Sequence, residues 1–283
     1  MNFKLNALVA AALLVAAGSA NAAMSGATSG NGELLINFIS QGGTSATAGG
    51  DDMSAVFDLG VSMNDFLTHK NQAGYTQTWS LTGANYGSAW SDLLAFSAND
   101  AAIEFNVIAL DNVNTRYLTT NDIATYSSLT NANLGGFQNM DLYVNANNLR
   151  GSNATEVNGA STALASDVAN SYFRAVNGAG QGDTWLTKTT DTTKNLATAQ
   201  NFWSLSVGAG SGSSQASKSA FGVDLNGNGS IGTGEFGEWS VNMAAGTVTF
   251  ANPAAPVPEA STYGMMLAGL GLVGFMARRR LAA

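Results

Sequence analysis

The chain contains no cysteine, one histidine and only three prolines among its 283 residues. Without cysteine there is no disulfide and no thiolate nucleophile, so the protein is not a small disulfide-stabilised scaffold. A histidine-based catalytic triad or zinc site would have to depend on His69 alone, and zinc sites of the usual kind need more ligands. His69 lies beside Lys70 and just before Gly74, where we expect a solvated loop.

Charge is also scarce. Charged residues make up 11% of the chain, and the formal net charge is −8, whereas about a quarter of the residues are charged in typical domains. Lys4 and the three arginines at 278–280 lie at the two ends, so the rest of the chain is more acidic than the whole. An acidic surface disfavours binding to nucleic acid and is compatible with divalent cations or neutral sugars.

The N-terminus predicts a signal peptide over residues 1–22. Lys4 precedes an apolar run from Ala7 to Ala17, and the small residues Ala20-Asn21-Ala22 follow it. This order of a basic start, an apolar stretch and a small-residue cleavage site is typical of secretory signals. We therefore expect residues 23–252 to form one exported domain, large enough to bury a core.

All three prolines lie between residues 253 and 258, and they predict a linker that leads to a C-terminal segment, residues 253–283. From Tyr263 to Ala277 this segment has no charge. As a helix it would span roughly 22 Å, short of the ~30 Å core of a bilayer, and residues 260–262 would extend it to a marginal span. Arginines at 278–280 would then stop its transfer, so a single transmembrane helix is predicted. A helix buried in the domain is the alternative, which its glycines disfavour.

The sorting signal itself is predicted just before this helix, at Val257-Pro258-Glu259-Ala260-Ser261. Together with the short apolar helix and the basic cluster Arg278, Arg279 and Arg280, it resembles the PEP-CTERM sorting tail, although Ala260 replaces a usual second proline. The resemblance covers about 27 residues by this count of the tail.

The resemblance implies an exosortase-type processing enzyme as a partner. It also implies an inner-membrane intermediate held by the C-terminal helix, followed by the cell surface or the exopolysaccharide matrix of a biofilm or floc of a Gram-negative bacterium. Some ice-binding proteins carry the same tail, which by itself says nothing about ice for this chain.

Alternation of apolar and polar residues predicts a mainly antiparallel β domain, sandwich-like, with a few short packed helices. A hairpin is predicted over residues 238–250, with Trp239 and Phe250 facing inward. Further strands are expected at 33–39, 55–60, 75–81, 103–110, 140–146 and 202–208. Helices are expected within 87–100, 120–134 and 161–176, where apolar residues recur at helical spacing.

The remaining candidate residues do not predict an enzyme. Asp51-Asp52, Asp58 and Glu104 are carboxylates that could cleave a glycosidic bond, but spacing favours no pair among them. Trp185 has loop-like surroundings and is the candidate for a sugar contact. We therefore expect a non-catalytic protein of the cell surface or matrix. A carbohydrate-binding, adhesive or ice-binding-like module is the alternative, and a secreted hydrolase is a third reading.

Residues 224–235 predict a calcium site. "DLNGNGSIGTGE" has the twelve-residue EF-hand loop pattern, with glycine at its sixth position. The oxygen ligands would come from Asp224, Asn226, Asn228, Ser230 and Glu235. Because the flanking segments read as strands and only two ligands are carboxylates, we expect a weak, stabilising Ca²⁺ site and no other cofactor. A polar glycine-rich connection between strands is the alternative.

Overall fold

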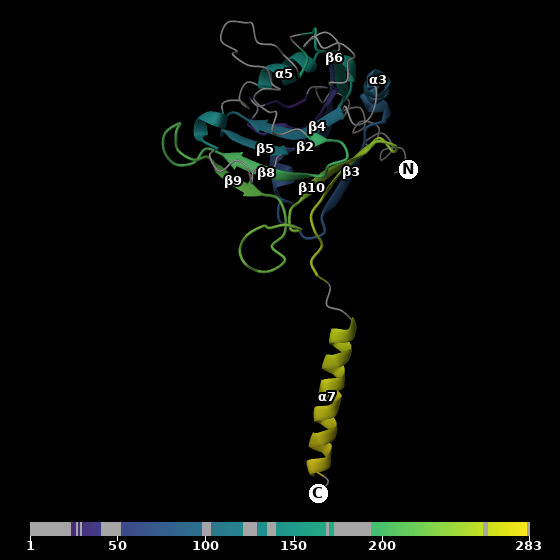
Figure 1. Ribbon diagram of the computed structural model, residues 1–283, viewed down its shortest axis with the longest axis vertical. Coiled ribbons are helices and arrows are strands. Elements are labelled where there is room, and N and C mark those ends of the chain that lie inside the picture. Colours follow the sequence, from purple (N-terminus) through teal and green to yellow (C-terminus); the bar gives the residue numbers. More distant parts are fainter. Residues whose placement is uncertain are drawn as a thin grey trace, which may run out of the picture.

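One strongly curved antiparallel sheet carries the fold of the computed structural model (Figure 1). The structure describes residues 24–26, 28, 30–40, 52–97, 103–120, 129–134, 140–167, 170–172, 194–256 and 260–281. The predicted signal peptide lies outside these residues. The strands of the sheet are β1 (Glu33–Ser40), β2 (Met53–Ser62), β3 (Thr76–Ser80), β4 (Ile103–Asp111), β5 (Arg116–Thr120), β6 (Ala160–Leu164), β7 (Lys194–Asn195), β8 (Gln200–Ser206), β9 (Ser217–Ala220), β10 (Glu238–Asn242) and β11 (Thr247–Ala251).

The strand order is β3-β11-β10-β8-β5-β4-β1-β2-β6, and β7 and β9 pair beside β4 and β8. The predicted mainly antiparallel β class with a few helices is confirmed, but the predicted sandwich-like arrangement is wrong, since the strands form one sheet. Strand β8 pairs with the whole of β5 through residues 202–206 and with β10 at Asn201 and Gln200. It thereby joins the two halves into one half-barrel sheet. The ends of the curve approach each other where the Trp79 indole N–H donates to the Leu59 carbonyl, 3.0 Å away.

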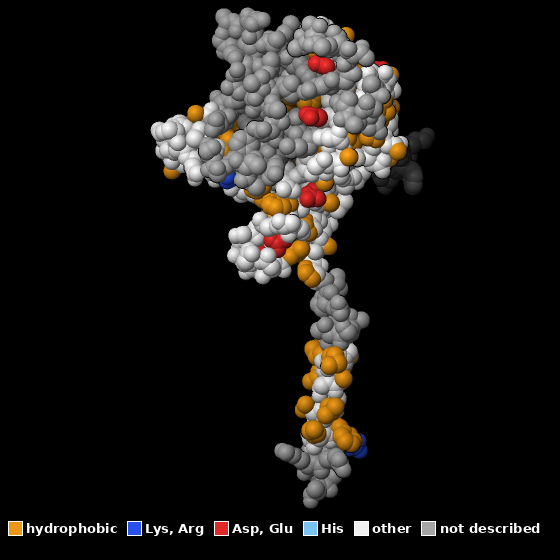
Figure 2. All heavy atoms as spheres, viewed as in Figure 1, with side chains coloured by type: hydrophobic (Ala, Val, Ile, Leu, Met, Phe, Trp, Pro, Cys, Tyr) orange, Lys and Arg blue, Asp and Glu red, His pale blue; other side chains and the backbone are white. Residues whose placement is uncertain are grey.

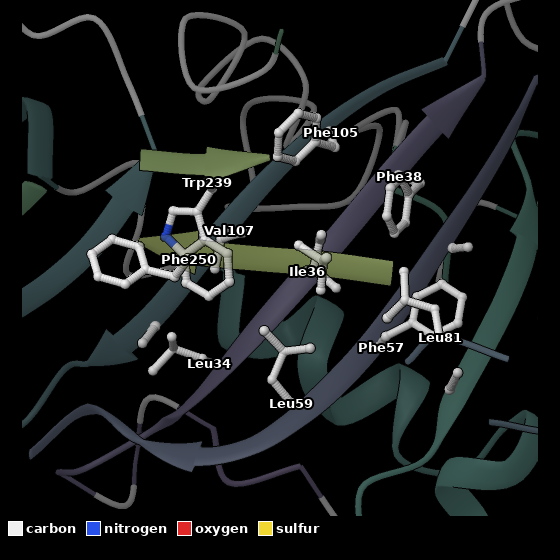
Figure 3. Close-up of a cluster of buried hydrophobic side chains, with 14 of the residues drawn as sticks. Leu34, Ile36, Phe38, Phe57, Leu59, Leu81, Phe105, Val107, Trp239 and Phe250 are labelled. Atoms are coloured by element: carbon white, nitrogen blue, oxygen red, sulfur yellow. The ribbon is translucent and has the colours of Figure 1, made fainter. Parts of the chain in front are cut away.

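Strand β1, which lies between β4 and β2 in the sheet, is buried on both faces, which explains its continuous apolar run. Leu34, Ile36 and Phe38 face the inside of the curve, where aromatic side chains from most of the sheet gather (Figure 3). Leu35 and Ile39 face the opposite side and pack with residues of the helix α5 (Met140–Asn147). The sheet therefore separates two hydrophobic clusters.

Short helices cover the open parts of the sheet. They are α2 (Met63–Leu67), α3 (Ala89–Phe96), α5, and the 3₁₀ turns η3 (Ala84–Tyr86), η6 (Asn131–Leu134) and η7 (Gly151–Ala154). The predicted helix at α3 is confirmed: Trp90 and Leu93 are buried, and Trp90 meets the Phe38 ring at 5.4 Å between centroids. The helical segment predicted over 120–134 lies mostly outside the described residues, apart from η6.

Two predicted elements were wrong. Residues 140–146 were predicted as a strand but form α5, since Met140, Tyr143, Val144 and Asn147 are the buried positions and recur at helical spacing. Residues 161–164 were predicted as the start of a helix but lie in β6, which pairs with β2 from Met53 to Phe57. Pairing with β2, whose edge would otherwise be open, outweighed the weak helical pattern of this segment.

Candidate functional site

The C-terminal tail stands apart from the domain as the helix α7 (Ala260–Leu281) (Figure 1). Figure 2 shows hydrophobic side chains along the described part of this helix, on the face in view. The large exposed ones are Met265, Met266, Leu267, Leu270, Leu272, Val273, Phe275 and Met276. A Cβ on Gly264, Gly269, Gly271 or Gly274 would meet no neighbouring atom within 4 Å. This exposure excludes the alternative of a C-terminal helix buried in the domain.

The predicted membrane crossing is not supported. Over the residues that the structure describes, no helix combines the length and the apolarity that crossing a membrane requires. The predicted helix itself is confirmed, and Arg278 is exposed near its end. The first residues of the predicted sorting motif, Val257 to Glu259, lie outside the described part of the chain, and the helix begins at Ala260.

The predicted calcium loop folds around the carboxylate of Asp224. Its Oδ1 accepts the backbone N–H groups of Gly227 at 2.7 Å and Asn228 at 3.1 Å, and its Oδ2 accepts that of Gly229 at 2.6 Å. These donors, the Gly229 N–H foremost, hold the pKa of Asp224 below its usual range. Asp224 is therefore ionised at neutral pH.

The other predicted ligands lie along the same loop. Asn226 Oδ1 accepts the Asn228 N–H, and Asn228 Oδ1 accepts the Ser230 N–H. Glu235 is buried and closes the loop, because its Oε1 accepts the Leu225 N–H at 3.0 Å and its Oε2 the Gly232 N–H at 2.8 Å. Because Glu235 accepts from Leu225, the residue after Asp224, the first and last predicted ligands lie at the two ends of a closed loop.

The backbone of this loop needs glycine. Gly227, Gly229 and Gly234 have φ angles of 72°, 80° and 81°, a region that other L-residues rarely adopt. The flanking elements are strands, as predicted: β9 ends before the loop and β10 begins after it. In the described part of the chain no three histidine, cysteine or acidic side chains are placed to hold a metal ion together, so a cation here would need amide and backbone oxygens beside the carboxylates of Asp224 and Glu235.

Two of the carboxylates considered for glycosidic cleavage, Asp58 and Glu104, do not come together. Asp58 in β2 lies opposite Leu35, and Glu104 in β4 lies opposite Ile39, on the two sides of β1. Four residues along a strand amount to about 13 Å, which exceeds the separations used by glycosidases. Asp52 precedes β2, and Asp51 lies outside the described residues.

Asp58 instead lies beside Glu33, a pairing that the sequence analysis missed. The register of β1 and β2 shifts between Glu33 and Leu35, and this irregularity brings the Glu33 side chain toward Asp58. Burial, then the charge of Glu33, raise the pKa of Asp58 from 3.8 to about 7. The Gly60 N–H donates to Asp58 Oδ1 at 2.8 Å and opposes the shift. No local pattern reveals this pair, because strand pairing creates it.

His69 was predicted in a solvated loop, and the structure places it, half-buried, in the turn after α2. Its ring stacks on Tyr75 with centroids 4.0 Å apart, and its Nδ1 lies 2.7 Å from Gln72 Oε1. These contacts with Tyr75 and Gln72 hold the ring against the turn. Trp185 lies outside the described residues, and Trp239 is buried as predicted.

A hydroxyl-bearing face lies on the outside of the sheet at β3, β11 and β10. Thr78 pairs with Thr249, which pairs with Ser240, and the two threonine hydroxyls are 2.8 Å apart. The next row is Ser80, Thr247 and Asn242. The β3 and β10 members of both rows are exposed, and neither row contains a charged residue.

Residues 256–280 match the family model of the PEP-CTERM protein-sorting motif. The match includes the segment that the resemblance pointed to, so that prediction is confirmed. No curated protein and no solved structure matches the chain. The motif indicates an exported protein that an exosortase-type enzyme sorts, and it implies a membrane-anchored intermediate on the way to the cell surface.

Proposed function

We propose that this is a non-catalytic protein of the cell surface or exopolysaccharide matrix, and that its C-terminal tail is a temporary sorting handle. The observation that carries the proposal is the sorting motif at residues 256–280, whose helix is exposed from Gly264 to Arg278. A permanent structural helix would bury its apolar residues, whereas eight large ones are exposed on α7. Such a surface needs a membrane or a partner until the tail is removed.

The domain itself supports a matrix role more than a catalytic one. Its carboxylates Asp58 and Glu104 are separated, and the His69 ring stacks on Tyr75. The uncharged rows of Thr78, Thr249 and Ser240 suit hydrogen bonding to a neutral polysaccharide, while the acidic body disfavours polyanions.

Two sets of variants test the sorting proposal. Replacing Pro258 and Glu259 by alanine removes the recognition motif and leaves the apolar helix and the arginines intact. We expect uncut, membrane-associated protein and at least a tenfold loss of the processed form. Replacing Arg278, Arg279 and Arg280 by glutamine removes the charges that hold the C-terminus inside. We expect unprocessed protein to be released.

The measurement is intact mass and C-terminal sequencing of the protein from membrane and matrix fractions of its own host. Pro253→Ala, a proline change outside the matched motif, is the control and should leave processing as it is in the unaltered protein. Recovery of the unaltered protein only at full length and in the cytoplasm would contradict the proposal. The same outcome for both sets of variants would contradict the division of roles between motif and arginines.

We also propose that the loop 224–235 binds Ca²⁺ and stabilises the exported domain. Its carboxylates at Asp224 and Glu235 and its amide oxygens are hard ligands of the kind that calcium prefers. At a calcium concentration ten times the dissociation constant, binding to the folded state raises the free energy of unfolding by about 1.4 kcal/mol. We expect the melting temperature to rise by about 3–6 °C for a domain of this size.

Asp224→Ala should abolish this rise, because it removes the carboxylate around which the loop is folded. Asp92→Asn, which removes an exposed carboxylate on α3, is the matched control and should keep the rise. The measurements are thermal unfolding and titration calorimetry with calcium. The absence of both binding heat and a change in melting temperature would end the calcium proposal.

A further inference from the structure

The folded domain ends in a clamp at Asn252, directly after β11. The Asn252 side chain is buried, and its Nδ2 donates to the carbonyls of His69 at 2.8 Å, Gln72 at 3.0 Å and Lys70 at 3.4 Å. Its backbone N–H donates to the Tyr75 carbonyl at 2.8 Å. One residue is thus held by four carbonyl groups of a single turn.

The turn that holds Asn252 is itself tied to the core. Gly74 donates its N–H to the Pro253 carbonyl at 2.8 Å, which extends the contact one residue further into the linker. The Tyr75 ring contacts Phe66 and Phe250, with centroids 6.2 Å apart in each case, and stacks on His69. The end of β11 therefore has a fixed position relative to the domain.

Little chain separates this fixed point from the sorting motif. Four residues, 253–256, stand between Asn252 and Val257, where the motif segment predicted from the sequence begins. Fully extended, four residues reach about 14 Å. Two of the four are proline, which favours an extended, stiff linker. A folded domain of about 230 residues has a radius of gyration of about 17 Å, so its bulk stays close to the motif.

We propose that the Asn252 clamp and the linker 253–256 act as a ruler that sets the distance between the folded domain and the sorting motif, and that this distance decides whether the processing enzyme can reach the motif. This inference rests on the proposed function. Asn252 is a positioning residue in it, since it contacts neither the motif nor the enzyme's reacting atoms. The domain is too wide to follow its tail into an active site, so the linker has to supply the clearance.

The physical consequence is that linker length and clamp strength compensate each other. Deleting Ala254 and Ala255 halves the clearance, to about 7 Å. Asn252→Asp places carboxylate oxygens against carbonyl oxygens and removes the donors. With the clamp broken, the end of β11 can fray. Each residue that leaves the sheet lengthens the linker by about 3.4 Å.

The experiment measures the processed fraction of four full-length chains in the host: the unaltered protein, the deletion of Ala254 and Ala255, Asn252→Asp, and both changes together. We expect the deletion to lower the processed fraction at least tenfold, Asn252→Asp alone to leave it within twofold, and the combination to restore at least half of it. A merely structural Asn252 would make the combination no better than the deletion. Asn252→Ala is the milder second variant.

Two controls separate this inference from the sorting proposal and from misfolding. An insertion of Gly-Ser after Ala255 lengthens the linker and should leave processing unchanged. Melting temperatures of the soluble domain should be the same for the deletion and the unaltered protein, because the deleted residues lie outside the sheet. Normal processing of the deletion variant, or its failure to recover with the broken clamp, would overturn the ruler while leaving sorting intact. An unaltered protein that is never processed would overturn both.

Discussion

Replacing Phe66 by alanine is expected to lower the free energy of unfolding by about 3–5 kcal/mol. Phe66 is fully buried in α2, and its ring contacts those of Tyr75, Phe202, Phe221, Trp239 and Phe250 with centroids 5.0–6.2 Å apart. It thereby joins the helix, which follows β2, to β8, β10 and β11 in the other half of the sheet. A loss of this size is a large fraction of the stability of a typical domain.

Denaturant unfolding at neutral pH is the measurement, followed by tryptophan fluorescence because Trp239 lies against the Phe66 ring. Phe96→Ala is the matched control. Phe96 ends α3 and is only half-buried, so its removal should cost less than half as much. Equal losses for the two variants would show that the Phe66 cluster is not the centre of the core. A Phe66→Leu variant, which keeps most of the volume, should recover much of the loss.

The elements that sequence reasoning predicted correctly are those whose signals are local. The hairpin β10–β11 shows alternation in both strands, and the glycine-rich segment 224–235 lies between two strands, as its polar composition indicated. The helix α7 follows from an uncharged run that ends in arginines. In each case the residues that determine the structure are neighbours in the sequence, so no knowledge of the tertiary fold was needed.

The features that sequence reasoning missed depend on contacts between distant segments. The half-barrel exists because β8 pairs with both β5 and β10. The sequence of β8 contains no pattern that predicts its pairing with β10. Segment 140–147 satisfies an alternating pattern as well as a helical one, and only its packing beneath β1 decides between them. The Asn252 clamp depends on a turn 180 residues earlier in the chain, at Gln72.

The stability of the domain is expected to fall as the pH rises from about 4 to about 7, because of Asp58. Burial and the neighbouring Glu33 raise the pKa of Asp58 from 3.8 to about 7 in the folded protein. In this window the folded state binds a proton that the unfolded state releases, so raising the pH favours unfolding. A shift of this size corresponds to a loss on the order of 4 kcal/mol, complete near pH 8.

Asp58→Asn should remove this dependence. The asparagine Oδ1 can still accept the Gly60 N–H, and the side chain carries no charge to bury. At pH 8 we expect the variant to be more stable than the unaltered protein by about 2–4 kcal/mol, and at pH 4 we expect the two to differ by less than 1 kcal/mol. Urea unfolding at a series of pH values is the measurement, with Glu238→Gln, an exposed site, as the control.

Glu33→Gln separates the two causes of the shift. It removes the charge that repels ionised Asp58 but leaves Asp58 buried, so the fall in stability should become smaller and move to lower pH without disappearing. If burial is the larger cause, as the order of the contributions indicates, more than half of the dependence should remain in this variant. A pH profile that is flat in the unaltered protein would contradict the whole account, since an ionised Asp58 would then be stable at the bulge between β1 and β2.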